Sequence, residues 1–280
     1  MIFVAGANGQ LGYEICKVLE SLNEDYYPIT RKDFNLVNTK EIYNFFINKQ
    51  PSVIIHCAAY TNVDLAEENK ELCYAVNTSG TKSLIDISKK IGCKFVYIST
   101  DYVFSGEKSY AYEVYDKVEP INYYGYTKAE GEKYLINNYH NSYIIRVSSV
   151  YGINGNNFVK SMINISKKSN EVNVVYDQIS SQSYAKDLAY GIINIINIGK
   201  PGIYHLTNEG YLSFYDFAIK IFEKLNINIK VNKILSKDYK SKAKRGLNLM
   251  LSKKCLKENN IPFLPTIEEG LLKFINEMRL

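Results

Sequence analysis

The chain has 280 residues, of which 46% are hydrophobic and 22% charged, and its formal net charge is +5. This length and composition are typical of a globular protein with one large or two modest domains. No run approaches the ~20 apolar residues that a membrane span needs, and Met1 leads into a strand-like run rather than a signal peptide. We therefore expect a cytoplasmic protein with no membrane partner.

The residues that bind metals or nucleic acids show no useful pattern. The five cysteines are odd in number and none forms a C-x-x-C pair, and the three histidines are far apart. This spacing favours neither a disulfide framework nor a metal site, so we predict no metal. Basic residues are spread along the chain and their local runs are short, so we expect no nucleic-acid partner.

Short apolar runs that are typical of buried parallel strands recur in the first half of the chain. They span residues 1–5, 26–30, 53–58, 94–99 and 142–147. Helical patterns lie between them. In residues 72–91 one apolar face is predicted from Leu72, Ala75, Val76, Leu84, Ile87 and Ile91. Strands that alternate with helices predict a doubly wound α/β fold of Rossmann type, with a parallel sheet covered on both faces.

The alternation becomes less regular after residue 152. We expect helices near 158–168, 183–197 and 213–225, and a strand near 172–175. The predicted division is a dinucleotide-binding domain over 1–150, to which 184–206 returns, and a smaller C-terminal α/β substrate lobe over 151–183 and 207–280. A ligand cleft would then lie between the two, at the carboxyl ends of the strands.

The first predicted strand leads into a glycine-rich loop at residues 6–12, and a helical pattern follows at once. Glycine permits a tight turn and a close approach of backbone N–H groups to a pyrophosphate, at the positive end of the helix. NAD-specific sites carry an acidic residue after the second strand, where this chain has Arg31 and Lys32. Those cations favour the 2′-phosphate of NADPH, with NADH as the alternative if they are ordinary surface charges.

Tyr124 and Lys128 are four residues apart, which places them one turn apart on one face of a helix. The lysine charge is expected to lower the pKa of the phenol, so that Tyr124 becomes a usable acid near neutral pH. The spacing alone is a weak signal in a chain with 25 tyrosines, and Tyr13 with Lys17 repeats it. Tyr124 differs because it follows the fourth predicted strand, which Thr100 closes with a hydroxyl group.

Several ordered blocks carry a family resemblance beside the glycine loop. They read HCAAYTNVDLAE over 56–67, VNTSGT over 76–81, STDYVF over 99–104, YGYTKAEGE over 124–132 and NFVK over 157–160. Together they span most of the first 190 residues. The combination resembles the extended short-chain dehydrogenase/reductase family and, within it, the dTDP-4-dehydrorhamnose reductases.

The resemblance implies an NAD(P)H-dependent oxidoreductase that reduces the 4-keto group of a nucleotide-diphosphate sugar, dTDP-4-dehydrorhamnose, to dTDP-L-rhamnose for surface polysaccharide synthesis. It implies a catalytic set in which Thr100 polarises the carbonyl, Tyr124 donates the proton and Lys128 assists. The implied cofactor contacts are Gly6, Asn8, Gly9, Gln10, Leu11, Gly12, Arg31, Asn35, Leu36, Ala58, Ala59, Tyr60, Asn77, Tyr124 and Lys128. The implied substrate contacts are Thr100, Asp101, Val103, Tyr124, Asn157, Lys160 and Arg245.

The departures from the family pattern lie on the substrate side. Ser149 stands where the family commonly has Trp, and Gly246 follows Arg245 where it commonly has Pro. The usual Asp-Gln-x-Gly-x-Pro-Thr loop reads DQISSQS over 177–183. Two alternatives therefore stay open: a reductase or epimerase-reductase of a different 4-keto nucleotide sugar, and a non-catalytic NADP-binding regulatory subunit. A homodimer is the expected assembly if the chain is not a monomer.

Overall fold

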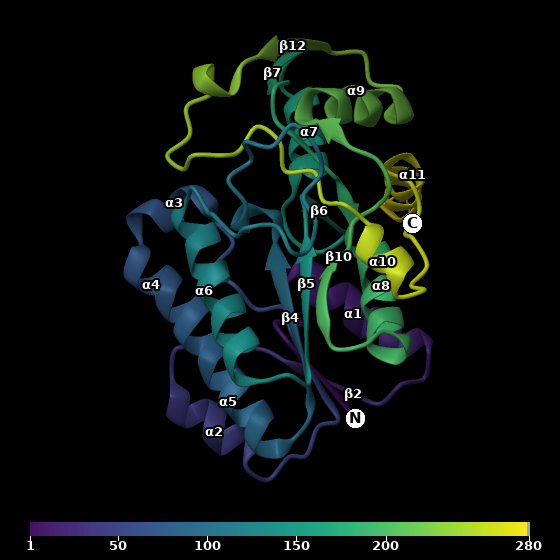
Figure 1. The fold of residues 1–280 in the computed structure, drawn as a ribbon. Helices are drawn as coiled ribbons and strands as arrows, with labels where there is room; N and C mark the ends of the chain where they lie inside the picture. The colour runs from purple at the N-terminus through teal and green to yellow at the C-terminus, as the bar shows by residue number, and fades with distance from the viewer. Residues whose placement is uncertain (279–280) are drawn as a thin grey trace.

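A six-stranded parallel sheet forms the centre of the computed structural model, which describes residues 1–278 (Figure 1). The strand order is β10-β5-β4-β3-β1-β2. The strands are β1 (Ile2–Ala5), β2 (Tyr26–Ile29), β3 (Val53–His56), β4 (Lys94–Thr100), β5 (Ser142–Val147) and β10 (Gly202–His205). The first five match the predicted apolar runs to within two residues, and the predicted fold class is confirmed. The order changes direction between β1 and β3, where doubly wound sheets bind their ligands.

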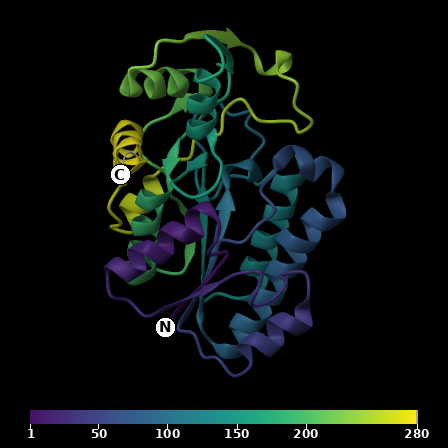
Figure 2. The ribbon, with the colours of Figure 1, turned by 180° about the vertical axis from the view of Figure 1, so that it is seen from behind.

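Helices cover both faces of the sheet (Figures 1 and 2). One face carries α1 (Gln10–Ser21) and α8 (Ala185–Ile198), and the other carries α2 (Thr39–Phe46), α5 (Thr81–Ile91) and α6 (Tyr123–Asn138). Neighbouring strand residues point to opposite faces. The first core therefore contains Val4, Ile55, Val96 and Ile145, and the second contains Phe3, Ile54, Phe95 and Ile144. Burial on both faces explains why these strands read as continuous apolar runs.

The connection from β3 to β4 departs from the predicted single helical face. It consists of α3 (Val63–Glu68), α4 (Lys70–Tyr74), the π-helical segment η1 (Ala75–Gly80) and α5. Leu84 and Ile87 are buried as predicted, but Leu72 is 51% exposed, so the prediction is wrong at its start. A π-helix bonds residues five apart rather than four, and this wider turn rotates Leu72 off the face that α5 buries.

A smaller lobe lies beyond the carboxyl ends of the sheet strands (Figure 1). Its strands β7 (Glu171–Val175) and β12 (Lys230–Ile234) pair in parallel. Around a core that includes Val174, Phe217 and Phe274 pack α7 (Phe158–Ser166), α9 (Phe214–Leu225) and α11 (Ile267–Met278). The short elements are η2 (Asp101–Val103), β6 (Val150–Tyr151), β8 (Ile179–Ser180), β9 (Ser183–Tyr184), β11 (Leu212–Ser213), η3 (Ser236–Asp238) and α10 (Lys254–Glu258).

The chain returns from this lobe to the central sheet. Helix α8 packs against α1, and β10 pairs in parallel with β5. The boundaries predicted for the two domains stay a prediction. Within residues 1–278, no helix combines the length and apolarity that crossing a bilayer requires.

Candidate functional site

The glycine loop between β1 and α1 leaves no room for side chains. Gly6 has a φ of +88°, and a Cβ there would lie 2.6 Å from the Ala58 nitrogen. A Cβ on Gly12 would lie 2.2 Å from the Gly6 oxygen, which also accepts a 2.9 Å hydrogen bond from the Gly9 N–H. The loop backbone is therefore pressed between the end of β3 and the first turn of α1.

The first turn of α1 presents unused backbone donors. Gly9 is the N-cap, and within residues 1–278 no side chain bonds to this helix start. Asn8 and Gly9 are exposed, whereas the Leu11 side chain is buried in the core, so Leu11 can offer only its backbone. Open N–H groups at a helix start attract phosphate, so this cradle fits the pyrophosphate of a dinucleotide.

The loop after β2 carries two cations near the glycine loop. The Asp33 carboxylate accepts hydrogen bonds from the Thr30 N–H at 2.8 Å and the Tyr27 hydroxyl at 2.9 Å, which ties it into its own turn. Arg31 and Lys32 are exposed. A carboxylate held inward and two cations facing solvent suit a ribose 2′-phosphate better than a 2′-hydroxyl.

The segment after β3 is fixed by a fully buried amide. The Asn77 Oδ1 accepts from the Tyr60 N–H at 2.7 Å, and its Nδ2 donates to the Tyr60 carbonyl at 3.1 Å and to the Thr127 Oγ1 at 3.0 Å. Asn77 thus acts as a positioning residue for the predicted contacts Ala58, Ala59 and Tyr60. Two further predicted contacts, Asn35 and Leu36, lie in the loop before α2, where Leu36 packs closely on Gly80.

Tyr124 and Lys128 lie one turn apart near the start of α6, as predicted. At the end of β4 the Thr100 hydroxyl donates to Asp101 Oδ1 at 2.9 Å, and the Ser148 hydroxyl donates to Asp101 Oδ2 at 2.5 Å. Burial raises the pKa of Asp101 to about 6, although both hydroxyl groups oppose that rise. Asp101 is therefore the residue that anchors the Thr100 hydroxyl.

The predicted lowering of the Tyr124 pKa is wrong. Burial raises the pKa of this phenol well above its usual value, the nearby Asp101 carboxylate adds to the rise, and the Thr100 hydroxyl opposes it. Lys128 is itself 2% exposed, and burial lowers its pKa to about 7 against the opposing charge of Glu132. Near neutral pH Lys128 thus carries only part of its charge, and Tyr124 keeps its proton.

A small cavity of about 10 Å³ lies between the ends of the sheet strands and the smaller lobe. Its lining consists of Asp101, Tyr102, Ser149, Gln178, Ile179, Ser180, Phe214, Arg245, Gly246 and Leu249. The Arg245 guanidinium pairs with the Asp64 carboxylate through two 3.1 Å hydrogen bonds. The Tyr102 ring packs edge-on against Tyr124, with centroids 5.9 Å apart, so the cavity borders the catalytic helix.

Of the predicted substrate contacts, Asp101 and Arg245 line this cavity, Thr100 and Tyr124 do not line it themselves, and the other three lie elsewhere. The Val103 side chain is fully buried in an apolar cluster with Phe104 and Tyr112, so we do not retain it. Asn157 caps α7 and donates to the Gln10 side chain at 3.0 Å, and the Lys160 ammonium donates to the Gly155 carbonyl at 2.9 Å. The Asn157 amide therefore lies against the start of α1, and the Lys160 ammonium lies over the turn at residues 153–155.

Sequence reasoning missed three residues that organise the site. Ser148 follows β5 directly and supports Asp101. Asn122 is the N-cap of α6, accepts from the Gly125 N–H at 2.8 Å and donates to the Lys244 carbonyl at 2.9 Å. An Asn before a helical pattern is a recognisable cap signal. Asp64 gave no such signal, because its partner Arg245 is 181 residues away.

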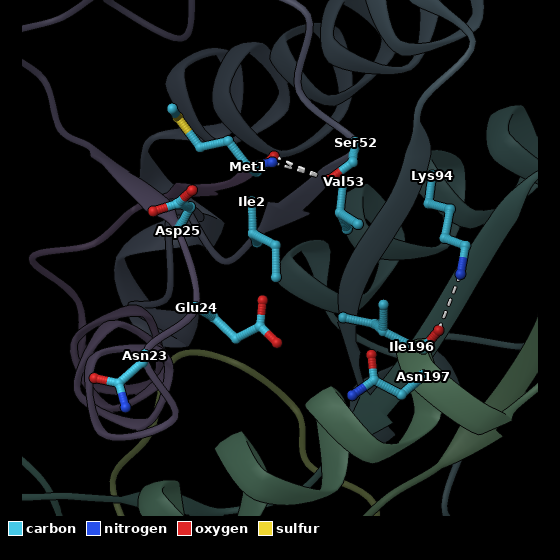
Figure 3. A pocket seen from close by; sticks show the side chains of 10 residues that line it. All are labelled: Met1, Ile2, Asn23, Glu24, Asp25, Ser52, Val53, Lys94, Ile196 and Asn197. Atoms are coloured by element: carbon cyan, nitrogen blue, oxygen red, sulfur yellow. Dashed lines mark hydrogen bonds between the residues drawn. The ribbon is translucent and has the colours of Figure 1, made fainter.

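A second hollow lies at the opposite, amino end of the strands (Figure 3). There the Lys94 ammonium donates to the Ile196 carbonyl at 3.0 Å, and the Met1 amine lies 3.4 Å from the Ser52 hydroxyl. Open α/β sheets bind ligands at the carboxyl ends of their strands. We therefore assign the site to the cavity beside Tyr124 and not to this hollow.

Known proteins share this chain's sequence and fold along its whole length. The family model of the RmlD substrate binding domain matches residues 1–280. The spore coat polysaccharide biosynthesis protein SpsK of Bacillus subtilis is 35% identical over 93% of this chain and 92% of its own. A dTDP-4-dehydrorhamnose reductase structure from Clostridium acetobutylicum is 37% identical with a TM-score of 0.97, over 100% of this chain and 99% of that one. Another from Bacillus anthracis, in complex with NADP, is 37% identical with a TM-score of 0.96, over 99% and 98%. The expected resemblance to the dTDP-4-dehydrorhamnose reductases is confirmed, and this chain belongs to the RmlD substrate binding domain family.

Proposed function

We propose that this chain is an NADPH-dependent oxidoreductase that reduces the 4-keto group of a nucleotide-diphosphate sugar, dTDP-4-dehydrorhamnose, to dTDP-L-rhamnose. The observation that carries the proposal is that the Thr100 hydroxyl, which Asp101 anchors at the carboxyl end of the sheet, counteracts the raised pKa of the half-buried Tyr124 phenol. The glycine loop, the exposed Arg31 and the NADP in the Bacillus anthracis relative support the cofactor assignment. An intact constellation favours a catalyst over a regulatory subunit.

The chain's own residues supply the proton and the polarisation. NADPH, when bound, supplies the hydride. A hydroxyl group has one donor site, so Thr100 turns its hydrogen from Asp101 to the substrate carbonyl, while Ser148 keeps Asp101 satisfied. Tyr124, protonated near neutral pH, transfers its proton to the carbonyl oxygen as negative charge develops there. The ammonium form of Lys128 stabilises the resulting phenolate.

In this proposal the sugar end of the substrate enters at the small cavity near Tyr124. The cavity volume of about 10 Å³ is far below the roughly 300 to 1,000 Å³ of ligand sites, so the lining side chains must move apart to admit the sugar, and the nucleotide must lie outside. A second candidate, a different 4-keto nucleotide sugar, is favoured by one feature of the lining. Ser149 has a φ of +42°, and its hydroxyl lies 3.1 Å from that of Ser180, which gives polar groups where relatives commonly carry an aromatic ring.

The deciding experiment measures NADPH oxidation with a panel of 4-keto nucleotide sugars. We expect kcat/KM for dTDP-4-dehydrorhamnose at or above about 10⁴ M⁻¹s⁻¹, and above that for the other sugars. A higher value for another 4-keto sugar would favour the second candidate. An enzyme preparation that binds NADPH but turns over none of the panel would contradict the proposed catalysis and favour a regulatory subunit.

Arg31 sets the cofactor preference in this proposal. NADPH is expected to bind more tightly than NADH, and Arg31→Ala should narrow the gap by about 1 to 3 kcal/mol, because one charged phosphate contact is lost. Calorimetric titration of both cofactors into both proteins measures the gap. Glu24→Gln, an exposed change elsewhere, serves as the control. Equal dissociation constants for the two cofactors in the unmodified protein would exclude this role.

Location and assembly belong to the same proposal. A cytoplasmic site is supported by the biosynthetic role named for the Bacillus subtilis relative and by the need for NADPH. The homodimer stays a prediction, which light scattering of the purified protein would test.

A further inference from the structure

Residues 242–246, which lead into the cavity lining, are held by contacts with distant parts of the chain. The Asp64 Oδ1, on α3, accepts hydrogen bonds from the backbone N–H groups of Lys242 at 3.1 Å and Ala243 at 3.0 Å. The same carboxylate binds both Nη atoms of Arg245 at 3.1 Å. One side chain therefore fixes both the backbone of this segment and its guanidinium group.

Two further contacts tie the segment to the catalytic region. The N-cap of α6, Asn122, donates to the Lys244 carbonyl at 2.9 Å. Gly246 crosses Gly106 so closely that a Cβ on Gly246 would lie 2.6 Å from the Gly106 Cα. The 242–246 segment thus has little freedom where Arg245 and Gly246 line the cavity.

The pairing with Asp64 leaves part of the Arg245 guanidinium for another anion. Its hydrogen bonds to Asp64 and to the Ala243 carbonyl take both hydrogens of Nη1 and one of Nη2, and the Tyr102 hydroxyl also interacts with this guanidinium. A guanidinium has five N–H donors in one plane, so Asp64 and Ala243 leave the Nε–H and the second Nη2–H as a fork, with the Tyr102 hydroxyl as its neighbour within residues 1–278. Such a fork matches two oxygens of a phosphate.

The Asp64 carboxylate and the Arg245 guanidinium carry opposite charges at neutral pH. Burial alone would raise the pKa of the Asp64 carboxyl, but the Arg245 guanidinium and the two backbone N–H groups hold it below its usual value. Asp64 is therefore ionised at neutral pH, and its side chain is 38% exposed while that of Arg245 is 19% exposed. Because the Asp64 carboxylate stays charged at neutral pH, it keeps its ion pair with the Arg245 guanidinium there.

We propose that Asp64 is a positioning residue for substrate binding: it holds the 242–246 segment so that the free fork of Arg245 receives the diphosphate of the nucleotide sugar. This inference rests on the proposed function for the identity of the ligand. It also opposes a simple alternative, in which Asp64 competes with the diphosphate for Arg245 and weakens binding.

The test compares two variants of Asp64 with a matched control on the same helix. Asp64→Ala removes all four hydrogen bonds. Asp64→Asn keeps an oxygen for the backbone N–H groups but sets an amide donor against Arg245, so it serves where the alanine variant folds poorly. Glu68→Gln removes the exposed ion pair with Lys242, whose side chains are 46% and 60% exposed, and should change little.

We expect Asp64→Ala and Asp64→Asn to raise the KM for dTDP-4-dehydrorhamnose and the Kd for thymidine diphosphate by about tenfold or more, with kcat within threefold of normal. A role in folding alone would not separate KM from kcat in this way. Unchanged or tighter thymidine diphosphate binding in both variants overturns the inference. If the unmodified protein shows no turnover, the proposed function fails, and the diphosphate affinities still decide the role of Asp64.

Discussion

The Tyr124 phenol is the group whose loss should reduce turnover most directly. Tyr124→Phe removes the proton donor and keeps the ring that packs on Tyr102, so kcat should fall by about 10² or more while the Kd for NADPH stays within twofold. Single-turnover and binding measurements separate the two effects. Tyr13→Phe is the matched control, because Tyr13 has the same spacing to Lys17 but lies exposed on α1. Turnover above a tenth of normal in Tyr124→Phe would exclude Tyr124 as the donor.

Lys128 should make the stability of the protein depend on pH. Its pKa in the folded protein is about 7, below the 10.5 of an unfolded chain, because burial disfavours the ammonium form. Between these pH values the unfolded chain binds a proton that the folded protein does not, so the free energy of unfolding rises with pH across this window. Below pH 7 both states are protonated, and the cost of burying the charge is present in full.

Lys128→Met removes this dependence, so the unmodified protein should gain stability relative to the variant as the pH rises from about 7 to 9.5. Urea unfolding without cofactor at several pH values measures the difference. Lys133→Met, an exposed position on the same helix, should track the unmodified protein at every pH. A stability difference between the unmodified protein and Lys128→Met that is constant with pH would show that Lys128 does not titrate in this range.

The glycine loop is the element on which cofactor binding depends. In Gly12→Ala the new Cβ would lie 2.2 Å from the Gly6 oxygen, so the loop must move and its N–H groups lose their alignment. The Kd for NADPH should rise about 100-fold, equivalent to two lost phosphate hydrogen bonds. Gly92→Ala is the control: at a φ of +82° with open space around it, it should cost about 1 to 2 kcal/mol of stability and leave the NADPH affinity unchanged. Equal losses of affinity in both variants would mean that stability, not the loop, is responsible.

Sequence patterns correctly predicted the elements whose structure depends on neighbouring residues in the chain. Strands β1 to β5 read as apolar runs because both sheet faces are covered, and the glycine loop shows itself by composition. The π-helical segment η1 could not be found this way. Its pitch places the Asn77 amide between Tyr60 and Thr127, and those partners are 17 and 50 residues away. The exposure of Leu72 follows from that tertiary requirement and not from its own neighbours.

At the scale of the whole molecule, the site residues that the sequence predicted lie in short local motifs, and those that it missed depend on contacts between distant segments. Tyr124, Lys128 and Thr100 lie at the start of a helix and the end of a strand, where short motifs mark them. The contact of Asp64 with Arg245 depends on how the smaller lobe returns over α3, and no pattern within either segment encodes it. The Tyr124 pKa was predicted with the wrong sign because burial and the nearby Asp101 carboxylate, neither of which sequence spacing reports, raise it.

A buried ion pair joins the catalytic helix to the central sheet and to the returning strand. Arg146, on β5, binds both oxygens of Glu132, on α6, at 3.0 and 2.7 Å, and both side chains are 2% exposed. The same guanidinium donates to the Val114 carbonyl and lies 3.2 Å from the Nε2 atom of His205, on β10. The charge of Glu132 also opposes the loss of charge on Lys128, so this pair supports both the fold and the site.

Glu132→Gln should lower the free energy of unfolding by about 3 to 5 kcal/mol, because it leaves the Arg146 charge buried without a counter-charge. Glu258→Gln, which removes an exposed pair with Lys254 at 3.7 Å, should change it by less than about 1 kcal/mol. Urea unfolding without cofactor measures both. The double variant Glu132→Leu, Arg146→Met removes both buried charges, so it should be more stable than Glu132→Gln alone. If the free energy of unfolding of Glu132→Gln falls by less than about 1 kcal/mol, the ion pair does not hold α6 to the sheet. The contacts of Arg146 with Val114 and His205 would then be enough to stabilise its buried charge.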